Sequence, residues 1–166
     1  MTTAPATMVR VGHGFDVHRF SGDPGRPLVL GGVTFPESPG LVGHSDADAV
    51  AHAVADALLG AAGLGDLGEH FPDSDPAWLD ADSLMLVEHV ARLVREAGWD
   101  IGNVDCSVVC EAPRLAPHRT EMQHRLSNAV GAPVSVKGRR AEGLGAIGRG
   151  EGIACWAVAV LVGQQN

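Results

Sequence analysis

The residues best suited to chemistry in this chain of 166 residues are Asp16 and His18, which lie two positions apart. Successive side chains of a β-strand point to opposite faces, so residues two apart project from the same face. On a strand, this carboxylate and imidazole converge on one point. Zinc accepts histidine nitrogen and aspartate oxygen, and a catalytic site uses three protein ligands and keeps one position open. His52, which we expect within a helix, is the candidate for the third ligand.

Spacing alone does not decide whether these residues form a metal site. Asp-x-His is a common pattern, and a helix histidine is usually solvated or packed in the core. Asp56 lies one helical turn beyond His52. It either orients the imidazole as an outer partner or is an ordinary aspartate on a polar helix face.

A second candidate is an anion site at His44, which precedes the same predicted helix. A helix N-terminus has free N–H groups and a partial positive charge, so it attracts phosphate. His44 could donate a hydrogen bond to a phosphate oxygen there. The alternative is ordinary capping, with Ser45 as the N-cap and Asp48 as its capping-box partner.

Two loops complete the set of candidates. Residues 66–76 are acidic and rich in glycine and proline, which suits a polyol better than a phosphate, or is simply a surface loop. Residues 143–152 are glycine-rich but match neither a Walker nor a Rossmann pattern. Their backbone N–H groups could cradle an anion beside Arg149, or the glycines could serve only a turn.

Alternation and helical spacing indicate the elements that position these residues. Residues 9–20 alternate as a strand, with Val9, Val11, Phe15 and Val17 on one face and Gly12, Gly14, Asp16 and His18 on the other. Gly31-Gly32 predicts a hairpin turn. The further predicted elements are helices at 45–62, 83–97 and 117–130, strands at 103–110 and 134–137, and a central strand at 153–162.

Together these elements predict an α/β (α+β) fold, in which three main helices cover one mixed β-sheet. We expect a single domain over residues 9–163 and a flexible N-terminal tail over residues 1–8. With 45% hydrophobic and 19% charged residues, the composition is that of a globular protein.

The same composition excludes several classes of function. The net charge of −8 argues against nucleic acid held by bulk electrostatics. No apolar run approaches the roughly 18 residues that cross a bilayer, and no secretion signal is evident, so we expect no membrane partner. Cys106, Cys110 and Cys155 are an odd number in apolar segments, which predicts buried thiols in a reducing cytoplasm.

Four segments in order, RVGHGFDVHRF, LVGHSDADAVAHAVADALLGAAGLGDLG, FPDSDP and GRGEGIA, resemble the 2-C-methyl-D-erythritol 2,4-cyclodiphosphate synthases of the non-mevalonate route to isoprenoids. The resemblance runs from residue 9 to residue 162. It implies a homotrimer, with sheets toward the three-fold axis and active sites between subunits. Metal and diphosphate bind on one side of each site, and cytidine binds on the neighbour. The 2-phosphate of the CDP-linked methylerythritol phosphate attacks the β-phosphorus, closes a cyclic diphosphate and expels CMP.

The resemblance also implies roles for individual residues. Zinc would bind to Asp16, His18 and His52, and Mg²⁺ or Mn²⁺ bridging the substrate diphosphate would bind to Glu142. His44 matches the family's transition-state-stabilising histidine. Some relatives bind isoprenoid diphosphates at the trimer axis, beside the arginine that Arg149 matches. The predicted substrate-contacting residues are Asp16, Val17, His18, His44, Ser45, Asp66, Leu67, Gly68, Phe71, Pro72, Asp73, Ser74, Asp75, Cys110, Glu111, Ala112, Pro113, Arg114, Leu115, Ala116, Arg139, Arg140, Ala141, Glu142, Ala146 and Arg149.

One segment departs from the family pattern. Members commonly have K-A-T-T-T-E where this chain has K-G-R-R-A-E, so Arg139 and Arg140 replace threonines that hold the nucleotide phosphates. Arg140 stands at the stabilising-threonine position and is therefore a candidate catalytic residue. Ala146 replaces an aromatic residue, and Arg114 replaces a lysine. Arginine binds phosphate by charge, but it is longer than threonine and cannot occupy the same space.

Two other functions stay open. The arginine pair would suit a zinc phosphodiesterase or cyclase acting on another nucleotide conjugate. Alternatively, the chain is a non-catalytic trimer that binds isoprenoid diphosphates in its axial channel. The presence of all of Asp16, His18, His52, His44 and Glu142 argues against that last function, because a binding protein need not keep them.

Overall fold

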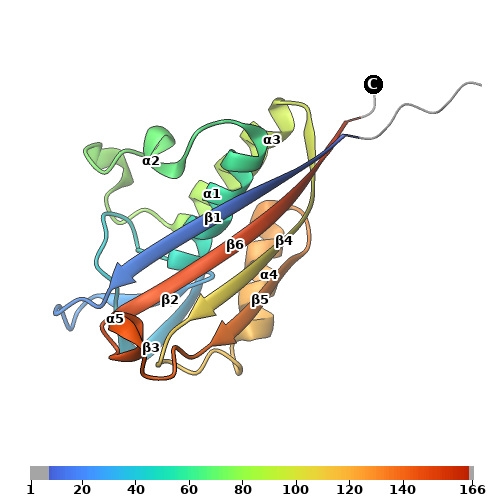
Figure 1. Ribbon diagram of the computed structural model, residues 1–166. Coiled ribbons are helices and arrows are strands. Elements are labelled where there is room, and N and C mark those ends of the chain that lie inside the picture. Colours follow the sequence, from blue (N-terminus) through green and yellow to red (C-terminus); the bar gives the residue numbers. More distant parts are fainter. Residues whose placement is uncertain (1–7, 165–166) are drawn as a thin grey trace, which may run out of the picture.

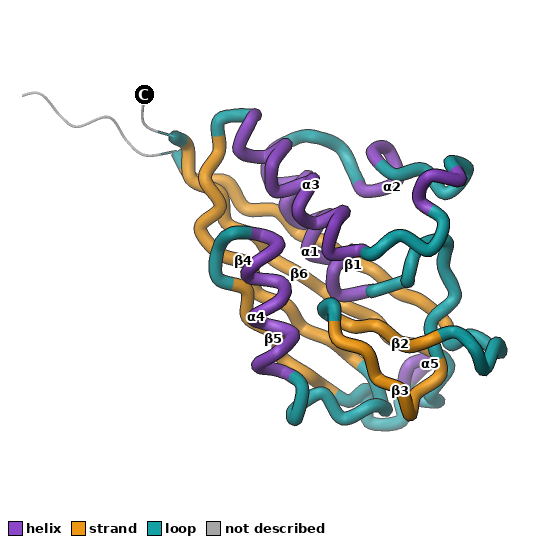
Figure 2. Tube along the Cα trace, turned by 180° about the vertical axis from the view of Figure 1, so that it is seen from behind, coloured by secondary structure: helices purple, strands orange, loops and turns teal. Residues whose placement is uncertain are grey.

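The computed structural model describes residues 8–164, and its centre is a four-stranded sheet covered on one face by helices (Figures 1 and 2). The strand order is β1-β6-β4-β5, in which β6 is antiparallel to both neighbours and β5 is parallel to β4. The predicted mixed sheet with a central last strand is therefore confirmed. Its elements are β1 (Val9–Arg19), β4 (Trp99–Val109), β5 (Val134–Arg139), β6 (Gly152–Gly163), α1 (Ala49–Ala62), α3 (Ser83–Glu96) and α4 (Arg119–Val130).

A separate hairpin pairs β2 (Pro27–Leu30) with β3 (Val33–Pro39). Its turn residues Gly31 and Gly32 have φ values of 58° and 72°, the left-handed conformation that a two-residue hairpin turn requires. Three short helical segments lie in the loops: α2 (Leu67–His70), the 3-10 helix η1 (Pro76–Trp78) and α5 (Gly145–Gly148). These short helices were not predicted, since three or four residues without a buried side chain leave no periodic pattern in the sequence.

Helix α1 lies directly against the inner face of β1. A Cβ atom added at Gly12 would lie 2.0 Å from the carbonyl oxygen of Ala57, and one at Gly14 would lie 2.0 Å from that of Ala53. Only glycine permits this approach of helix and strand backbones. The close approach brings His52 of α1 beside the metal-ligand candidates of β1.

The start of α1 corrects the predicted cap. The helix begins at Ala49 and Asp48 is its N-cap, not Ser45. The buried carboxylate of Asp48 accepts hydrogen bonds from the N–H groups of Val50 and Ala51 and also from those of Gly31 and Gly32. One side chain thus caps the helix and ties the hairpin turn to it.

Helix α4 also starts later than predicted. It begins at Arg119 with His118 at its N-cap position, two residues beyond Pro117. The N–H of His118 bonds to the carbonyl of Leu115 at 2.9 Å, so the preceding residues form a turn of their own.

The two faces of β1 differ as the alternation predicts, but the apolar side chains lie on the face away from the helices. Glycine, Asp16 and His18 face α1. Phe15 of β1 packs on Trp156 of β6, with 4.9 Å between ring centroids, and both remain partly exposed. We call this surface the outer face; its exposed apolar residues are Val9, Val11, Phe15, Val17, Trp156 and Val158.

Cys106, Cys110 and Cys155 are buried and free, as expected. Among the described residues, the helices are all too short or too polar to cross a membrane. The predicted tail falls almost wholly on residues 1–7, which lie outside the described residues.

Candidate metal centre

Three side chains from two elements converge at one point. Asp16 and His18 come from β1, and His52 comes from α1. The Asp16 Oδ2 atom lies 2.8 Å from Nε2 of His18 and 3.0 Å from Nδ1 of His52, and the two nitrogens are 3.4 Å apart. Among the described residues, these three form the group that could hold a metal ion. The predicted convergence is confirmed.

The spacing of the three atoms fits a zinc ion. Ligands about 2.1 Å from a tetrahedral centre lie about 3.4 Å from one another. The His18–His52 separation already has this value, while the two Asp16 distances are those of hydrogen bonds. One carboxylate and two imidazoles are a donor set that zinc accepts, and a fourth position stays open for a ligand.

The electrostatics of the group favour a charged Asp16. Burial alone would raise the pKa of Asp16, but hydrogen bonds from His18 and His52 outweigh it and hold that pKa well below its usual range. Burial alone would lower the pKa of His18, and the bond to Asp16 overcomes this and raises it. Without a metal, hydrogen bonds to the charged carboxylate therefore favour the protonated form of His18 over the neutral one.

The outer nitrogens of both histidines are also bonded. His18 Nδ1 lies 2.7 Å from the carbonyl oxygen of Val42 and must donate to it, so Nε2 of the neutral ring carries the lone pair. His52 Nε2 lies 2.9 Å from Oγ of Ser83 and 3.1 Å from Oγ of Ser45. Such partners fix the orientation of metal-ligating imidazoles.

Of the two alternatives for Asp56, the one in which it orients His52 is wrong. Its carboxylate accepts a hydrogen bond from the N–H of Leu67 at 3.1 Å and so holds the start of α2. The carboxylate of Asp56 is therefore bonded to the loop that follows α1, and not to the imidazole of His52 one helical turn earlier.

A pocket of about 260 Å³ opens beside His18 and His52, and several predicted substrate residues line it. His44 stands at its wall, where its Nε2 contacts the carbonyl oxygen of Asp75 at 3.1 Å. An adjoining pocket of about 220 Å³ reaches Asp16. The predicted residues lining one or both pockets are Asp16, His18, His44, Ser45, His52, Asp66, Leu67, Gly68, Phe71 and Asp73. The side chain of Val17 projects to the outer face instead.

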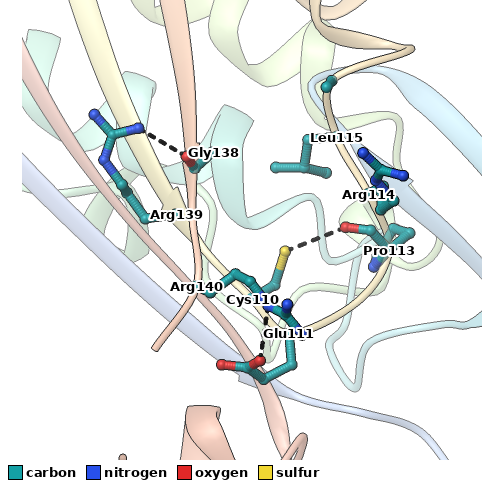
Figure 3. Close-up of a pocket in the computed structure, with 9 residues that line it drawn as sticks. Cys110, Glu111, Pro113, Arg114, Leu115, Gly138, Arg139 and Arg140 are labelled. Carbon is teal, nitrogen blue, oxygen red and sulfur yellow. Dashed lines mark hydrogen bonds and ion pairs between the residues drawn. The ribbon is translucent and has the colours of Figure 1, made fainter. Parts of the chain in front are cut away.

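A third pocket, of about 500 Å³, lies at the ends of β4 and β5 (Figure 3). Glu111 organises it, since one carboxylate oxygen accepts from Nε of Arg140 at 3.2 Å and the other from the N–H of Ala141 at 2.9 Å. The Arg139 guanidinium bonds the carbonyl of Gly138 and points away from Arg114. We call this third pocket the arginine pocket; it is lined by Cys110, Glu111, Pro113, Arg114, Leu115, Ala116, Gly138, Arg139 and Arg140.

The cysteine in this pocket is not a nucleophile. Burial, together with the charge of Glu111, raises the pKa of Cys110 to about 11. A thiol is nucleophilic only as its thiolate, so Cys110 can line the pocket but cannot attack a substrate at neutral pH.

One chain does not join the two halves of the predicted site. The strands β1, β4 and β5 run in the same direction, so their ends lie at one end of the sheet, but β1 and β5 form its opposite edges. The metal group lies at the β1 edge and the arginine pocket at the other. Glu142, Ala146 and Arg149 belong to the loop after β5 and line none of these three pockets.

Three contacts of the metal group went unnoticed in the sequence: the Val42 carbonyl, Ser83, and Asp46, which accepts a bond from Ser83. Ser83 follows an aspartate at a helix start, which signals a cap and not a partner of a distant histidine. Asp46 lies within the segment assigned to the helix N-terminus. A carbonyl oxygen leaves no trace in the residue type.

The comparisons with known proteins agree with this geometry. The model of the YgbB family matches residues 9–162. The 2-C-methyl-D-erythritol 2,4-cyclodiphosphate synthase of Bacillus cereus (strain ATCC 10987 / NRS 248) is 50% identical over 157 residues, covering 93% of this chain and 98% of that protein. The IspF of Plasmodium falciparum, solved as a CDP complex, matches with a TM-score of 0.82 and 31% identity over 95% of this chain and 97% of its own. The bifunctional IspDF from Campylobacter jejuni matches with a TM-score of 0.90 and 39% identity, over 96% of this chain and 43% of its own.

Proposed function

This chain belongs to the YgbB family, and from that membership we propose that it converts 4-diphosphocytidyl-2-C-methyl-D-erythritol 2-phosphate to 2-C-methyl-D-erythritol 2,4-cyclodiphosphate and CMP. This is a lyase reaction of the non-mevalonate route to isoprenoids. The observation that carries the proposal is the metal-ligand group of Asp16, His18 and His52, whose two histidines line one pocket with His44 and Ser45.

The reaction needs no protein nucleophile. An oxygen of the 2-phosphate forms a bond to the β-phosphorus, the bond from that phosphorus to the α–β bridging oxygen breaks, and CMP leaves with the electron pair. Asp16, His18 and His52 would hold zinc, which would supply a Lewis acid that neutralises phosphate charge. His44 and Ser45 donate hydrogen bonds to the phosphate beside it and hold the attacking and leaving oxygens in line. Loop residues 66–75 orient the erythritol.

The nucleotide would bind in the arginine pocket of a neighbouring subunit. Support for this comes from the separation of the two half-sites at opposite edges of the sheet, and from the exposed apolar outer face, which an assembly would bury. A homotrimer with its sheets around the three-fold axis meets both conditions. Arg140 would then reach the nucleotide phosphates from the neighbour, which is the catalytic role that we propose for it.

Further proposals follow from the same family pattern. Glu142 would hold Mg²⁺ or Mn²⁺ between the α- and β-phosphates. Arg149 would lie near the axis, where an isoprenoid diphosphate could bind. Ala146 and the remaining predicted substrate residues would contact the nucleotide or the erythritol. The three free, buried thiols support a cytoplasmic location. Residues 9–163 would form one domain, preceded by a tail.

Mixing two inactive variants tests the proposal. Asp16→Asn removes a metal ligand. Gly138→Phe places a ring in the arginine pocket, where a Cβ atom added at Gly138 would contact only Leu115, at 3.4 Å. Each variant alone should release little CMP from the CDP-linked substrate. Refolding the two together should restore activity, because a shared site of a mixed trimer joins an intact metal half to an intact nucleotide half.

Two results would count against this function. A folded, zinc-loaded wild type that releases no CMP contradicts the synthase activity and leaves the non-catalytic trimer. Tighter binding of another nucleoside diphosphate than of CDP favours a zinc enzyme with a different nucleotide substrate, which the arginine pair makes worth testing. Wild-type activity with no recovery in the mixture contradicts only the sharing of sites between subunits.

A further inference from the structure

A chain of hydrogen bonds runs from the metal-ligand candidate His52 into the protein. Its Nε2 atom lies 2.9 Å from Oγ of Ser83, and that hydroxyl lies 2.5 Å from Oδ1 of Asp46. The other oxygen of Asp46 accepts from the N–H of Ser83 at 3.1 Å. Ser83 is fully buried at the first position of α3, so water does not compete for these bonds.

The chemistry of the groups fixes the direction of each bond. A carboxylate has no proton, so Asp46 can only accept and the Ser83 hydroxyl must donate to it. The Ser83 oxygen then offers lone pairs to His52, whose Nε2 must donate. A neutral imidazole with its proton on Nε2 has its lone pair on Nδ1, the atom that faces Asp16 and His18. A metal ion that took the place of the hydrogen bond between Nδ1 and Asp16 would meet that lone pair.

Ser45 is a second neighbour of the same nitrogen, at 3.1 Å, and its oxygen also accepts from the N–H of Ala47 at 3.2 Å. The single Nε2 proton points best at one acceptor, and Ser83 is the nearer one. Since Ser83 satisfies this proton, the Ser45 hydroxyl can turn its own proton into the pocket that it lines with His44.

Asp46 is itself held in place. Its Oδ1 atom also accepts from the N–H of Asp48 at 3.1 Å, and its N–H donates to the carbonyl of Ala81 at 3.1 Å. The turn before α1 and the start of α3 are therefore locked together around one carboxylate.

We propose that Asp46 and Ser83 are positioning residues for the metal site: they fix the tautomer and ring orientation of His52 and keep the Ser45 hydroxyl free for a phosphate oxygen. The inference rests on the metal site of the proposed function. Neither residue was expected to act there from the sequence.

The first test of this positioning role is the zinc affinity of Ser83→Ala, which is measured by competition with a chromophoric chelator. We expect zinc to bind about 10–100-fold more weakly than in the wild type, the usual loss when the outer partner of a metal-ligating histidine is removed. CMP release should also slow through a lower kcat, because the Nε2 proton of His52 then bonds to Ser45. The Ser45 hydroxyl is then less free to turn toward a phosphate oxygen. The matched control is Ser127→Ala in α4. It removes a hydroxyl that accepts a hydrogen bond of 2.9 Å from the N–H of Val134. It should leave zinc affinity unchanged.

A second readout needs neither zinc nor activity. ¹⁵N NMR of the metal-free protein at mildly alkaline pH reports which nitrogen of His52 carries the proton. The measurement uses an Asp16→Ala background, in which no carboxylate competes for a proton on Nδ1. There His52 should show the Nε2–H form, and adding Ser83→Ala should give a mixture of both tautomers. Asp46→Asn replaces one of two acceptors by a donor, so it should shift the same signals, and adding it to Ser83→Ala should change zinc affinity little further.

A Ser83→Ala variant that keeps zinc affinity within about threefold of the wild type, well short of the loss expected for an outer partner, and retains the Nε2–H form would overturn the inference. So would equal losses in Ser83→Ala and Ser127→Ala, because the effect would then be general destabilisation. The proposed function fails separately, through absent CMP release from a zinc-loaded wild type. If the wild type bound no zinc, the tautomer of His52 would still decide whether Asp46 and Ser83 fix the ring.

Discussion

The metal group and the arginine pocket solve different physical problems. Asp16, His18 and His52 are 12–23% exposed, and each contacts another member of the group or an outer partner. In the arginine pocket the Arg140 side chain is 68% exposed and makes one ion pair. A buried charge is costly unless it is paired, whereas an exposed guanidinium needs no partner. The metal half thus carries its full geometry within one chain, while the proposed nucleotide half presents an exposed charge to solvent.

The strongest test of this difference between the two halves is Asp16→Asn. The substitution removes the charge that holds both imidazoles and one of three metal ligands. Zinc affinity should fall by more than about 100-fold, since loss of a mere partner of a ligand already costs about 10–100-fold. CMP release should fall with it. Equilibrium dialysis followed by metal analysis measures the first effect, and a nucleotide assay measures the second.

The control for Asp16→Asn is Gly138→Phe, which changes only the other half. It should bind zinc as the wild type does while losing activity. Stoichiometric zinc in Asp16→Asn, or lost zinc in Gly138→Phe, would contradict the view that the metal half is complete in one chain.

The next prediction separates the halves by blocking assembly. Val158 lies on the outer face and is 41% exposed. Val158→Asp would place a charge in the proposed interface, which costs several kcal/mol when the charge has no partner. We expect a monomer that still binds zinc but has lost roughly 99% of its activity, a penalty of about 2.7 kcal/mol at about 1.36 kcal/mol per tenfold. Sedimentation and zinc binding are measured on the same sample.

Glu88→Gln, an exposed change on α3, serves as the control for Val158→Asp and should alter neither mass nor activity. An active Val158→Asp monomer would show that one chain completes the site. Loss of zinc together with assembly would show that the metal half depends on a neighbour.

The features set by a local pattern could be predicted from the sequence, whereas those set by distant contacts could not. The convergence of Asp16 and His18 was predictable because β-strand alternation places them on one face. His52 was a candidate third ligand from its residue type, and the family resemblance then supported all three. The start of α1 was not, because the choice of Asp48 over Ser45 as cap depends on the distant turn at Gly31 and Gly32. A local pattern cannot contain that contact.

Long-range partners were the second blind spot. Ser83 and Asp46 are 37 positions apart in sequence, and only the docking of α3 beside the turn before α1 brings them to His52. The apolar residues of β1 gave the opposite difficulty. Alternation found both faces, but the face against α1 is the one with glycines, since two backbones meet there.

A third prediction uses pH to sharpen the description of the metal half. The folded-state pKa of Asp16 is lowered, so its contribution to stability is present above its unfolded value near 3.9 and is lost as pH falls through the folded value. The pKa of His18 is raised, so its contribution is complete below about 6.5 and is lost as pH rises through the folded value. The metal-free group is therefore most stabilising between about pH 4 and 6.5.

Zinc reverses the dependence above that window, because it binds the deprotonated imidazole. The rise in melting temperature on adding zinc should be small near pH 5.5 and should grow through pH 8. At free zinc about 100 times the dissociation constant, the stabilisation reaches about 2.7 kcal/mol. Scanning calorimetry with zinc or with EDTA measures it, and Asp16→Asn should show no increment. An increment that falls with pH would contradict the assigned ligands.

The smallest effect is expected from Arg140→Thr, which probes the nucleotide half alone. Arg140 offers charge to a phosphate, but it is exposed and already bonded to Glu111 through Nε. Its removal should weaken CDP binding by about 3–10-fold at low salt and by less at high salt, because an exposed ionic contact is screened. It also leaves Glu111 without its cation, and this carboxylate then repels the diphosphate. Titrations with CDP and with cytidine at two ionic strengths separate these effects, since cytidine lacks the phosphates. A loss that is equal for both ligands and independent of salt would mean that Arg140 shapes the pocket and does not bind charge.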